Sequence, residues 1–182
     1  MLKKIICLIF INYVYLFSID FDSYKSGDII FRKENSFLSD IFSNIDTFDY
    51  SHGGILKKED NQFYVYHMER TNSNEKDLKK DEISKFLSKS ERYSIIRLKQ
   101  KFSEDRLFFI LKNYENMKDL KFDIQFLLNN GDNNLYCSEF IYIVYKKLID
   151  INIYSYLYEI IGKKGITLRS IYTNESIFEK IQ

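Results

Sequence analysis

The first half of the chain consists of short apolar runs between polar turns. A turn over 26–28 precedes the run Ile-Ile-Phe at 29–31, which predicts a short buried strand. A second strand is expected to begin at 55–56. The turn over 57–61 then leads into a third strand over 63–68, in which alternate side chains share a face. The pattern therefore predicts two antiparallel strands joined by a short hairpin.

Three stretches show the helical spacing of apolar residues. The first is 35–42, and the second is 104–117, where Ser103 is placed to cap the helix and an acidic first turn suits its dipole. The third begins at Cys137, after a polar turn over 129–134, and has one apolar face. That face comprises Cys137, Ile141, Val144 and Leu148.

The segment 70–90 is strongly charged and is expected to be a loop with one short helix over 83–87. A further strand is expected over 93–98. The whole pattern predicts the α+β fold class, with a small antiparallel sheet packed on the helix that carries the cysteine. At 182 residues the chain is long enough for one domain with a real core, and no repeat or linker divides it.

The charge of the chain is nearly balanced, with a formal net charge of +1. The sequence has no basic block beyond short pairs such as Lys79-Lys80 and Lys163-Lys164, as expected of a solvated face with mixed charges. Electrostatics therefore give no support for a nucleic-acid partner. The pair Gly53-Gly54 lacks the lysine and the helix start of a phosphate-binding loop.

The N-terminus has the features of an export signal. Lys3 and Lys4 precede an apolar run over 5–17, which is too short for the roughly 20 residues of a membrane span. We expect residues 1–18 to be a signal peptide, or else an uncleaved anchor, and residues 19–182 to form the domain. The domain is then expected in the periplasm, in the cell envelope close to the membrane, or outside the cell.

The exported domain would contain a single cysteine. The chain has two cysteines, and one of them lies in the predicted signal, so Cys137 would be left alone in an oxidising compartment. Such a thiol is either a buried small hydrophobe or a group with chemical work. The first turn of a helix favours thiolate over thiol, so at this position Cys137 is expected to be a reactive nucleophile.

The only two histidines of the chain complete a candidate site. His52 precedes the second strand and His67 ends the third, so the hairpin should bring them together at one end of the sheet. One cysteine and two histidines suffice for a nucleophile, a base and an orienting group. The same three residues could bind a metal, but no CxxC or HxxxH spacing supports this. We therefore expect neither a metal nor an organic cofactor.

Four motifs in a fixed order resemble a known family. They are Gly27-Asp28-Ile29-Ile30-Phe31-Arg32, Ser51-His52-Gly53-Gly54-Ile55, Tyr64-Val65-Tyr66-His67 and Tyr136-Cys137-Ser138-Glu139-Phe140. Over about residues 27–148 the chain is similar to the YiiX-like group of circularly permuted papain-like cysteine hydrolases, in the NlpC superfamily. Ordinary papain-like enzymes place cysteine before histidine, and the permuted group reverses that order, as this chain does.

The resemblance implies roles for individual residues. Cys137 corresponds to the nucleophile, His52 to the base, and His67 to the third, orienting residue, which is commonly Glu in YiiX-like sequences and His in some related families. Glu69 projects to the same strand face as His67 and is a substitute candidate. Tyr136 and Asp28 are supporting candidates, the first alternatively a core residue and the second alternatively a turn residue.

The resemblance also implies an activity. It would be hydrolysis or acyl transfer at an amide or ester bond, through a thioacyl intermediate on Cys137. Members of the superfamily act on cell-wall peptides, other amides or lipid acyl groups, so the expected substrate is a peptide, a cell-wall fragment or a lipid derivative. The alternative from another class is a catalytically silent module that holds a peptide or lipid in the same cleft.

Overall fold

The computed structural model of the chain describes residues 23–34, 47–71, 75–88, 90–128, 131, 133–160 and 163–182. The predicted signal peptide over 1–18 and the helix expected over 35–42 lie outside the described residues. In the described part of the chain, no helix has the length and apolar character that a membrane crossing requires.

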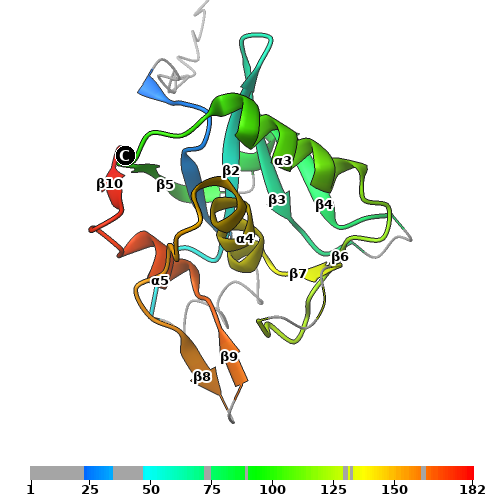
Figure 1. Ribbon diagram of the computed structural model, residues 1–182, viewed down its shortest axis with the longest axis vertical. Coiled ribbons are helices and arrows are strands. Elements are labelled where there is room, and N and C mark those ends of the chain that lie inside the picture. The colour runs from blue at the N-terminus through cyan, green and yellow to red at the C-terminus, as the bar shows by residue number, and fades with distance from the viewer. Residues whose placement is uncertain are drawn as a thin grey trace, which may run out of the picture.

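A six-stranded antiparallel sheet forms the centre of the molecule (Figure 1). Its strand order is β10-β5-β1-β2-β3-β4, so β5 returns across the sheet to pair with β1. The strands are β1 (Ile29–Glu34), β2 (His52–Glu59), β3 (Gln62–Met68), β4 (Leu78–Glu82), β5 (Ser90–Leu98) and β10 (Phe178–Lys180). The predicted hairpin is confirmed as β2 and β3, and β2 begins at His52 itself. The turn expected over 57–61 was too long, because residues 57–59 continue β2 and pair with 62–64, which leaves only Asp60 and Asn61 between the strands.

Two long helices cover one face of this sheet. The helix α4 (Cys137–Ile149) packs on β2 and β3, and α3 (Glu104–Asn116) packs on α4 (Figure 1). The cap predicted for α3 is present, because the Ser103 side chain accepts a hydrogen bond from the Arg106 N–H. The α4 stripe that the sequence predicted is buried in the main core, which confirms the α+β fold class.

The opposite face of the sheet carries a smaller core under the short helix α2 (Ile83–Leu87). Strand alternation divides the two cores: Ile29 and Phe31 of β1 lie in the α4 core, and Ile30 lies in the α2 core. Phe86 of α2 is completely buried. The helix α2 was predicted from the sequence and holds the second core against the sheet.

The expectation that 70–90 is a loop around this helix was wrong in part, because strand β4 occupies its middle. Strand β4 pairs with β3 at the edge of the sheet, with Asp81 opposite Val65 and Lys79 opposite His67. The sequence gives no alternation here, since an edge strand beside solvent is charged rather than apolar. Its position next to His67 makes β4 part of the site.

Smaller elements complete the chain. Strands β6 (Lys121–Phe122) and β7 (Asn134–Leu135) form a short parallel pair, and α4 starts two residues after β7 ends. Strands β8 (Tyr158–Ile160) and β9 (Lys163–Gly165) form an antiparallel pair, followed by α5 (Leu168–Tyr172). These elements contribute Ile166, Leu168 and Ile171 to the main core.

The last residues of the chain return to the first described ones. Strand β10 pairs with β5, and the Ile95 N–H then donates to the Gln182 carbonyl at 2.8 Å. The Tyr24 hydroxyl donates to the Gln182 side chain at 2.5 Å, and the Arg97 guanidinium donates to the Ser23 carbonyl at 2.7 Å. Ser23 and Gln182 therefore lie at the same edge of the sheet.

Candidate active site

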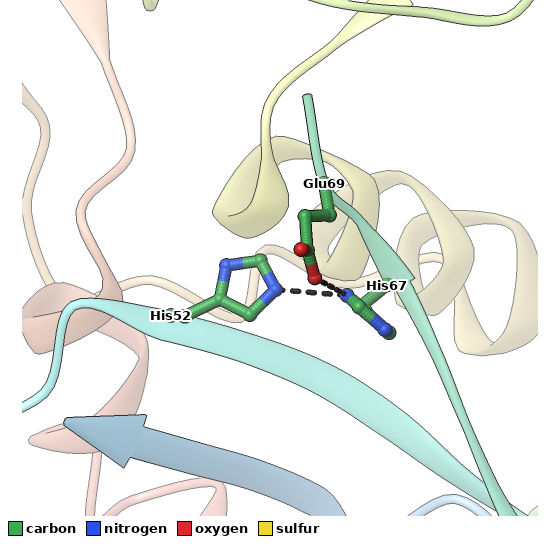
Figure 2. A group of neighbouring side chains, drawn as sticks. All are labelled: His52, His67 and Glu69. Atoms are coloured by element: carbon green, nitrogen blue, oxygen red, sulfur yellow. Dashed lines mark hydrogen bonds and ion pairs between the residues drawn. The ribbon is translucent and has the colours of Figure 1, made fainter. Parts of the chain in front are cut away.

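The two histidines are in direct contact. The His52 Nε2 lies 2.9 Å from the His67 Nδ1, and the two rings stand nearly perpendicular. Figure 2 shows the second nitrogen of the His52 ring, Nδ1, on the side that faces away from His67. His67 is completely buried and His52 is nearly so. The hairpin thus brings the predicted base and the predicted orienting residue together, as the sequence indicated.

Gly54 makes this contact sterically possible. A Cβ at position 54 would lie 2.5 Å from the Val65 Cγ1 and 2.9 Å from the His67 Cβ. Both distances are far shorter than a normal van der Waals contact, so any side chain at position 54 would push β3 and His67 away from β2. The glycine of the Ser-His-Gly-Gly motif is therefore a packing requirement of the histidine pair.

An aromatic ring and a guanidinium close the α2 side of the pair. The Phe86 ring centroid lies 5.8 Å from that of His52 and 5.0 Å from that of His67. The Arg32 guanidinium stacks over Phe86 at 4.1 Å and donates to the Phe86 carbonyl at 2.6 Å. Arg32 is opposite His52 in the β1–β2 register and is only 1% exposed. Phe86 and Arg32 thus shield one side of the histidine pair from water.

Two carboxylates neutralise Arg32. Its Nη2 donates to Glu34, and it lies 3.3 Å from the Glu69 Oε2. That same Glu69 oxygen is 3.7 Å from the His67 Nδ1, which is outside hydrogen-bonding distance (Figure 2). Glu69, a substitute candidate from the sequence, is therefore in the cluster, but its hydrogen bond goes to Arg32.

Asp81 of β4 contacts the other side of His67. Its Oδ2 lies 3.4 Å from the His67 Nε2, and its Oδ1 accepts from the Lys85 ammonium at 2.7 Å. Burial lowers the pKa of His67, and the nearby Arg32 charge acts in the same direction, so the ring is neutral near pH 7. The hydrogen bond from His67 holds the pKa of Asp81 well below its usual range. The contact is therefore between a neutral imidazole and a carboxylate.

The predicted nucleophile lies at the same end of β2. Cys137 is the first residue of α4, is 8% exposed, and is a free thiol. Its sulfur lies beside the backbone N–H groups of Ser138 and Gly53, the second of which follows His52. Gly53 allows α4 to come this close, because a Cβ there would lie 3.3 Å from the Ile141 Cδ1 and 3.1 Å from the Leu168 Cδ2.

The expectation that the helix start would favour thiolate at rest was wrong. Burial raises the pKa of the Cys137 thiol to about 11, and the nearby Glu34 carboxylate acts in the same direction. The backbone N–H groups of Ser138, Gly53 and Cys137 lower it, but by less than burial raises it. Near neutral pH the resting Cys137 side chain is therefore a thiol and not a thiolate, and a base must remove its proton during the reaction.

Two supporting candidates have structural roles in this arrangement. The Tyr136 hydroxyl accepts a buried hydrogen bond from the Ile166 N–H at 2.7 Å, which ties the segment after β9 to the start of α4. Asp28 accepts two hydrogen bonds from Arg97, each of 2.7 Å, and one from the Lys25 N–H at 2.8 Å. Its backbone pairs with Leu56, four residues along β2 from His52, or roughly 13 Å. Asp28 is thus remote from the histidines.

Sequence reasoning did not identify Arg32, Phe86 or Asp81 as parts of the site. Arg32 had a signal, because a charge that continues the apolar strand at 29–31 shares a face with buried Ile30. Asp81 had none, since it lies among the charged residues 79–82. These residues shield the histidines on one side and contact His67 on another.

Three side chains of the cluster are of types that suit a metal ion. One atom from each of His52, His67 and Glu69 lies within 4.8 Å of the other two. In this arrangement, however, the two histidine nitrogens bond to each other and the Glu69 oxygen contacts Arg32. A cation would have to break both contacts beside a buried guanidinium, so the donor types fit a metal and their present arrangement does not.

The helix α4 carries a cysteine at its first turn and packs against a sheet that carries two contacting histidines. This is the arrangement of a papain-like thiol hydrolase fold. In this chain the histidines precede the cysteine. The comparisons agree. The chain belongs to the permuted papain-like amidase family YaeF/YiiX, also called the C92 family, whose model matches residues 23–175.

A solved structure has the same fold. It is the metalloprotein YiiX from Escherichia coli O157:H7, which is 18% identical, with a TM-score of 0.73 over 88% of this chain and 97% of that one. The comparison with curated proteins found no match.

Proposed function

We propose that this protein is an exported cysteine hydrolase or acyltransferase that acts on an amide or ester bond, with Cys137 as nucleophile and His52 as base. The observation that carries the proposal is the contact between His52 Nε2 and His67 Nδ1 next to the start of α4. His67 engages Nε2, and in this proposal the Nδ1 of His52, on the side of the ring that faces away from His67, takes the thiol proton. Family membership supports the cysteine-hydrolase class.

The reaction begins with a neutral thiol. As the Cys137 sulfur attacks the substrate carbonyl, the His52 Nδ1 takes the thiol proton, so thiolate forms only in the attack. The backbone N–H of Cys137 at the start of α4 stabilises the oxyanion. The imidazolium then gives its proton to the leaving amine or alkoxide, and a thioacyl enzyme remains. Water or an acceptor, deprotonated by His52, releases the acyl group.

The substrate follows from location, which is part of the proposal. Lys3, Lys4 and the apolar run over 5–17 support export, so a peptide, cell-wall fragment or lipid derivative of the envelope is the expected substrate. Nothing in the charge of the chain favours a nucleic acid. N-terminal sequencing of the protein isolated from its native cell tests this, with a start near residue 19 expected.

Trapping of the acyl group tests the enzyme directly. The full-length protein is incubated with envelope extract and digested, and the Cys137 peptide is searched by mass spectrometry for an added acyl mass. The wild type should carry the adduct, whereas Cys137→Ser should carry at most a stable ester, and His52→Ala should carry none. Unmodified Cys137 together with retained binding of an envelope peptide or lipid would identify the silent binding module instead.

A cation at His52, His67 and Glu69 is the second candidate function. It is favoured by the grouping of the three donor atoms within 4.8 Å, and the similar fold of the metalloprotein YiiX adds support. The bound ion would engage the His52 Nε2 and would compete with His67 for it. We expect calorimetric titration of the metal-free protein with Zn²⁺ to show no binding site at these residues. A Zn²⁺ site that is present in the wild type and lost in Glu69→Gln would favour the cation over the hydrogen-bonded pair.

A further inference from the structure

His67 has a contact at each of its two ring nitrogens. Nδ1 lies 2.9 Å from the His52 Nε2, and Nε2 lies 3.4 Å from the Asp81 Oδ2. A neutral imidazole has one N–H donor and one lone-pair acceptor, so only one of the two contacts can use a hydrogen from His67. Which nitrogen carries that hydrogen decides the tautomer of both histidines.

Asp81 determines the direction of the hydrogen bond between the two histidines. A carboxylate can only accept, so the hydrogen of His67 must be on Nε2, and Nδ1 presents its lone pair to His52. The His52 Nε2 then has to donate, which leaves the His52 Nδ1 as a lone pair. That tautomer is the one in which Nδ1 can take a proton.

The sheet register places Asp81 for this contact. Asp81 is opposite Val65, and Val65 shares a strand face with His67, two residues further along β3. The Asp81 side chain therefore lies diagonally next to the His67 ring, and Lys85, the third residue of α2, holds its other oxygen at 2.7 Å. Two elements that pack on β3 thus fix the carboxylate.

Charged groups on the other sides of His67 do not compete for its hydrogen. Glu69 is 3.7 Å from Nδ1 and contacts Arg32 instead. Arg32 faces the ring from β1 and is itself a donor without a lone pair. Burial lowers the pKa of His67, which keeps one of its nitrogens as an acceptor near pH 7.

We propose that Asp81 is a positioning residue that fixes the tautomers of both histidines, by one direction of hydrogen bonding from His52 to His67 to Asp81. This rests on the proposed function only in that His52 then acts as the base for Cys137. No proton moves along the chain of contacts: the thiol proton goes to the His52 Nδ1 and from there to the leaving group, and Asp81 stays ionised throughout.

Nitrogen NMR tests the proposal without any turnover. The chain has two histidines, so ¹⁵N-labelled full-length protein gives two imidazole patterns, each of which separates the N–H nitrogen from the lone-pair nitrogen. Near pH 7 both rings should carry their hydrogen on Nε2. In Asp81→Ala the His67 pattern should become mixed or change to Nδ1–H. A wild type with His67 as Nδ1–H, or a pattern that Asp81→Ala leaves unchanged, would overturn the inference.

Kinetics supply a second readout. Asp81→Ala should lower kcat by about tenfold to a hundredfold, the range for loss of a hydrogen bond to a charged group, with little change in KM. Asp81→Asn, which still offers an acceptor, should recover part of this loss. Lys112→Gln is the control, because it removes an exposed ion pair with Glu115 within α3 and should leave both tautomers and kcat near wild type.

A double variant gives the sharpest outcome. In His67→Glu a carboxylate accepts directly from His52, so Asp81 becomes a second negative charge facing the first. Asp81→Asn should therefore raise the activity of His67→Glu, although it lowers that of the wild type. The same loss in both backgrounds would make Asp81 a purely structural residue. If the tautomers are as stated but no variant turns over any substrate, the proposed function fails and the hydrogen-bond direction stands.

Discussion

The two ends of β1 both bury a charged residue, and the partners of those residues differ in kind. At the first end, Asp28 is bonded by Arg97 through two nitrogens, and only a backbone N–H adds a third bond. At the other end, Arg32 is shared by Glu34, Glu69 and a carbonyl, beside two contacting histidines. The first arrangement pairs opposite charges completely, whereas the second includes two imidazole rings, whose nitrogens can each donate or accept a hydrogen bond. Burial of a charge therefore does not by itself mark a site.

The largest effect is expected from loss of the nucleophile near the histidine end of β1. Cys137→Ser should lower turnover by about a thousandfold or more, since a serine hydroxyl is a much weaker nucleophile with the same base. The free energy of unfolding should change by less than about 1 kcal/mol. Steady-state assay and urea denaturation measure the two. Ser138→Ala, which removes a bond to the Ile166 carbonyl, is the matched control and should keep turnover.

Asp28→Ala should destabilise the fold at the other end of β1 without changing the rate of the reaction. It leaves Arg97 without its carboxylate and removes a residue that is 1% exposed, so the free energy of unfolding should fall by about 3–5 kcal/mol. The kcat of the folded fraction should equal that of the wild type. Urea denaturation and active-site-normalised assays decide this. A fall in kcat with unchanged stability would move Asp28 into the site.

The resting state of the thiol gives the next effect. Because burial raises the pKa of Cys137 to about 11, alkylation by iodoacetamide without substrate should rise only towards that pH, later than the roughly 8.5 of a free cysteine. Mass spectrometry of the Cys137 peptide across pH 6–11 measures the profile. The urea-unfolded protein is the control and should titrate near 8.5. Rapid labelling of folded protein at pH 7 would indicate a resting thiolate instead.

Stability should depend on pH through His67. Its pKa is lowered in the folded state, so between that pKa and about 6.5 the unfolded chain binds more protons, and the free energy of unfolding falls as the pH falls. The slope should not exceed about 1.4 kcal/mol per pH unit for this residue. Denaturation at pH 5–7.5 measures it, and His67→Gln should flatten the curve. A stability that increases towards pH 5 would contradict a buried neutral ring.

The smallest effect expected is that of a chelator. His52, His67 and Glu69 are engaged with one another and with Arg32, so EDTA followed by buffer exchange should leave turnover unchanged. Elemental analysis of the treated protein is the control that any bound metal has gone. A loss of activity that Zn²⁺ or Mn²⁺ restores would favour the cation at this end of the sheet.

The histidine hairpin and the cysteine helix could be predicted because their signals are local. Alternation over 63–68 sets the face of His67, a polar turn ending at Asp60-Asn61 sets the pairing, and the stripe from Cys137 to Leu148 sets the buried side of α4. The cap at Ser103 depends on neighbouring residues only. Each of these signals is contained in a few consecutive turns or strands.

The surroundings of the histidines could not be predicted, because they depend on pairings between distant segments. Asp81 reaches His67 only through the β3–β4 register, and the charged edge strand that sets this register has no apolar pattern. The pKa of Cys137 also illustrates the limit. A helix start and burial act in opposite directions, and the sequence reveals the first while only packing reveals the second.

The meeting of Ser23 and Gln182 at one sheet edge has a consequence for connectivity. A short peptide could join these two residues, and the chain could be opened instead over 99–103, between β5 and α3. Every strand pairing of the central sheet would remain, yet Cys137 would now precede His52 along the chain. The order of cysteine and histidine is thus a matter of where one ring of chain is cut, and the same site is compatible with either cut.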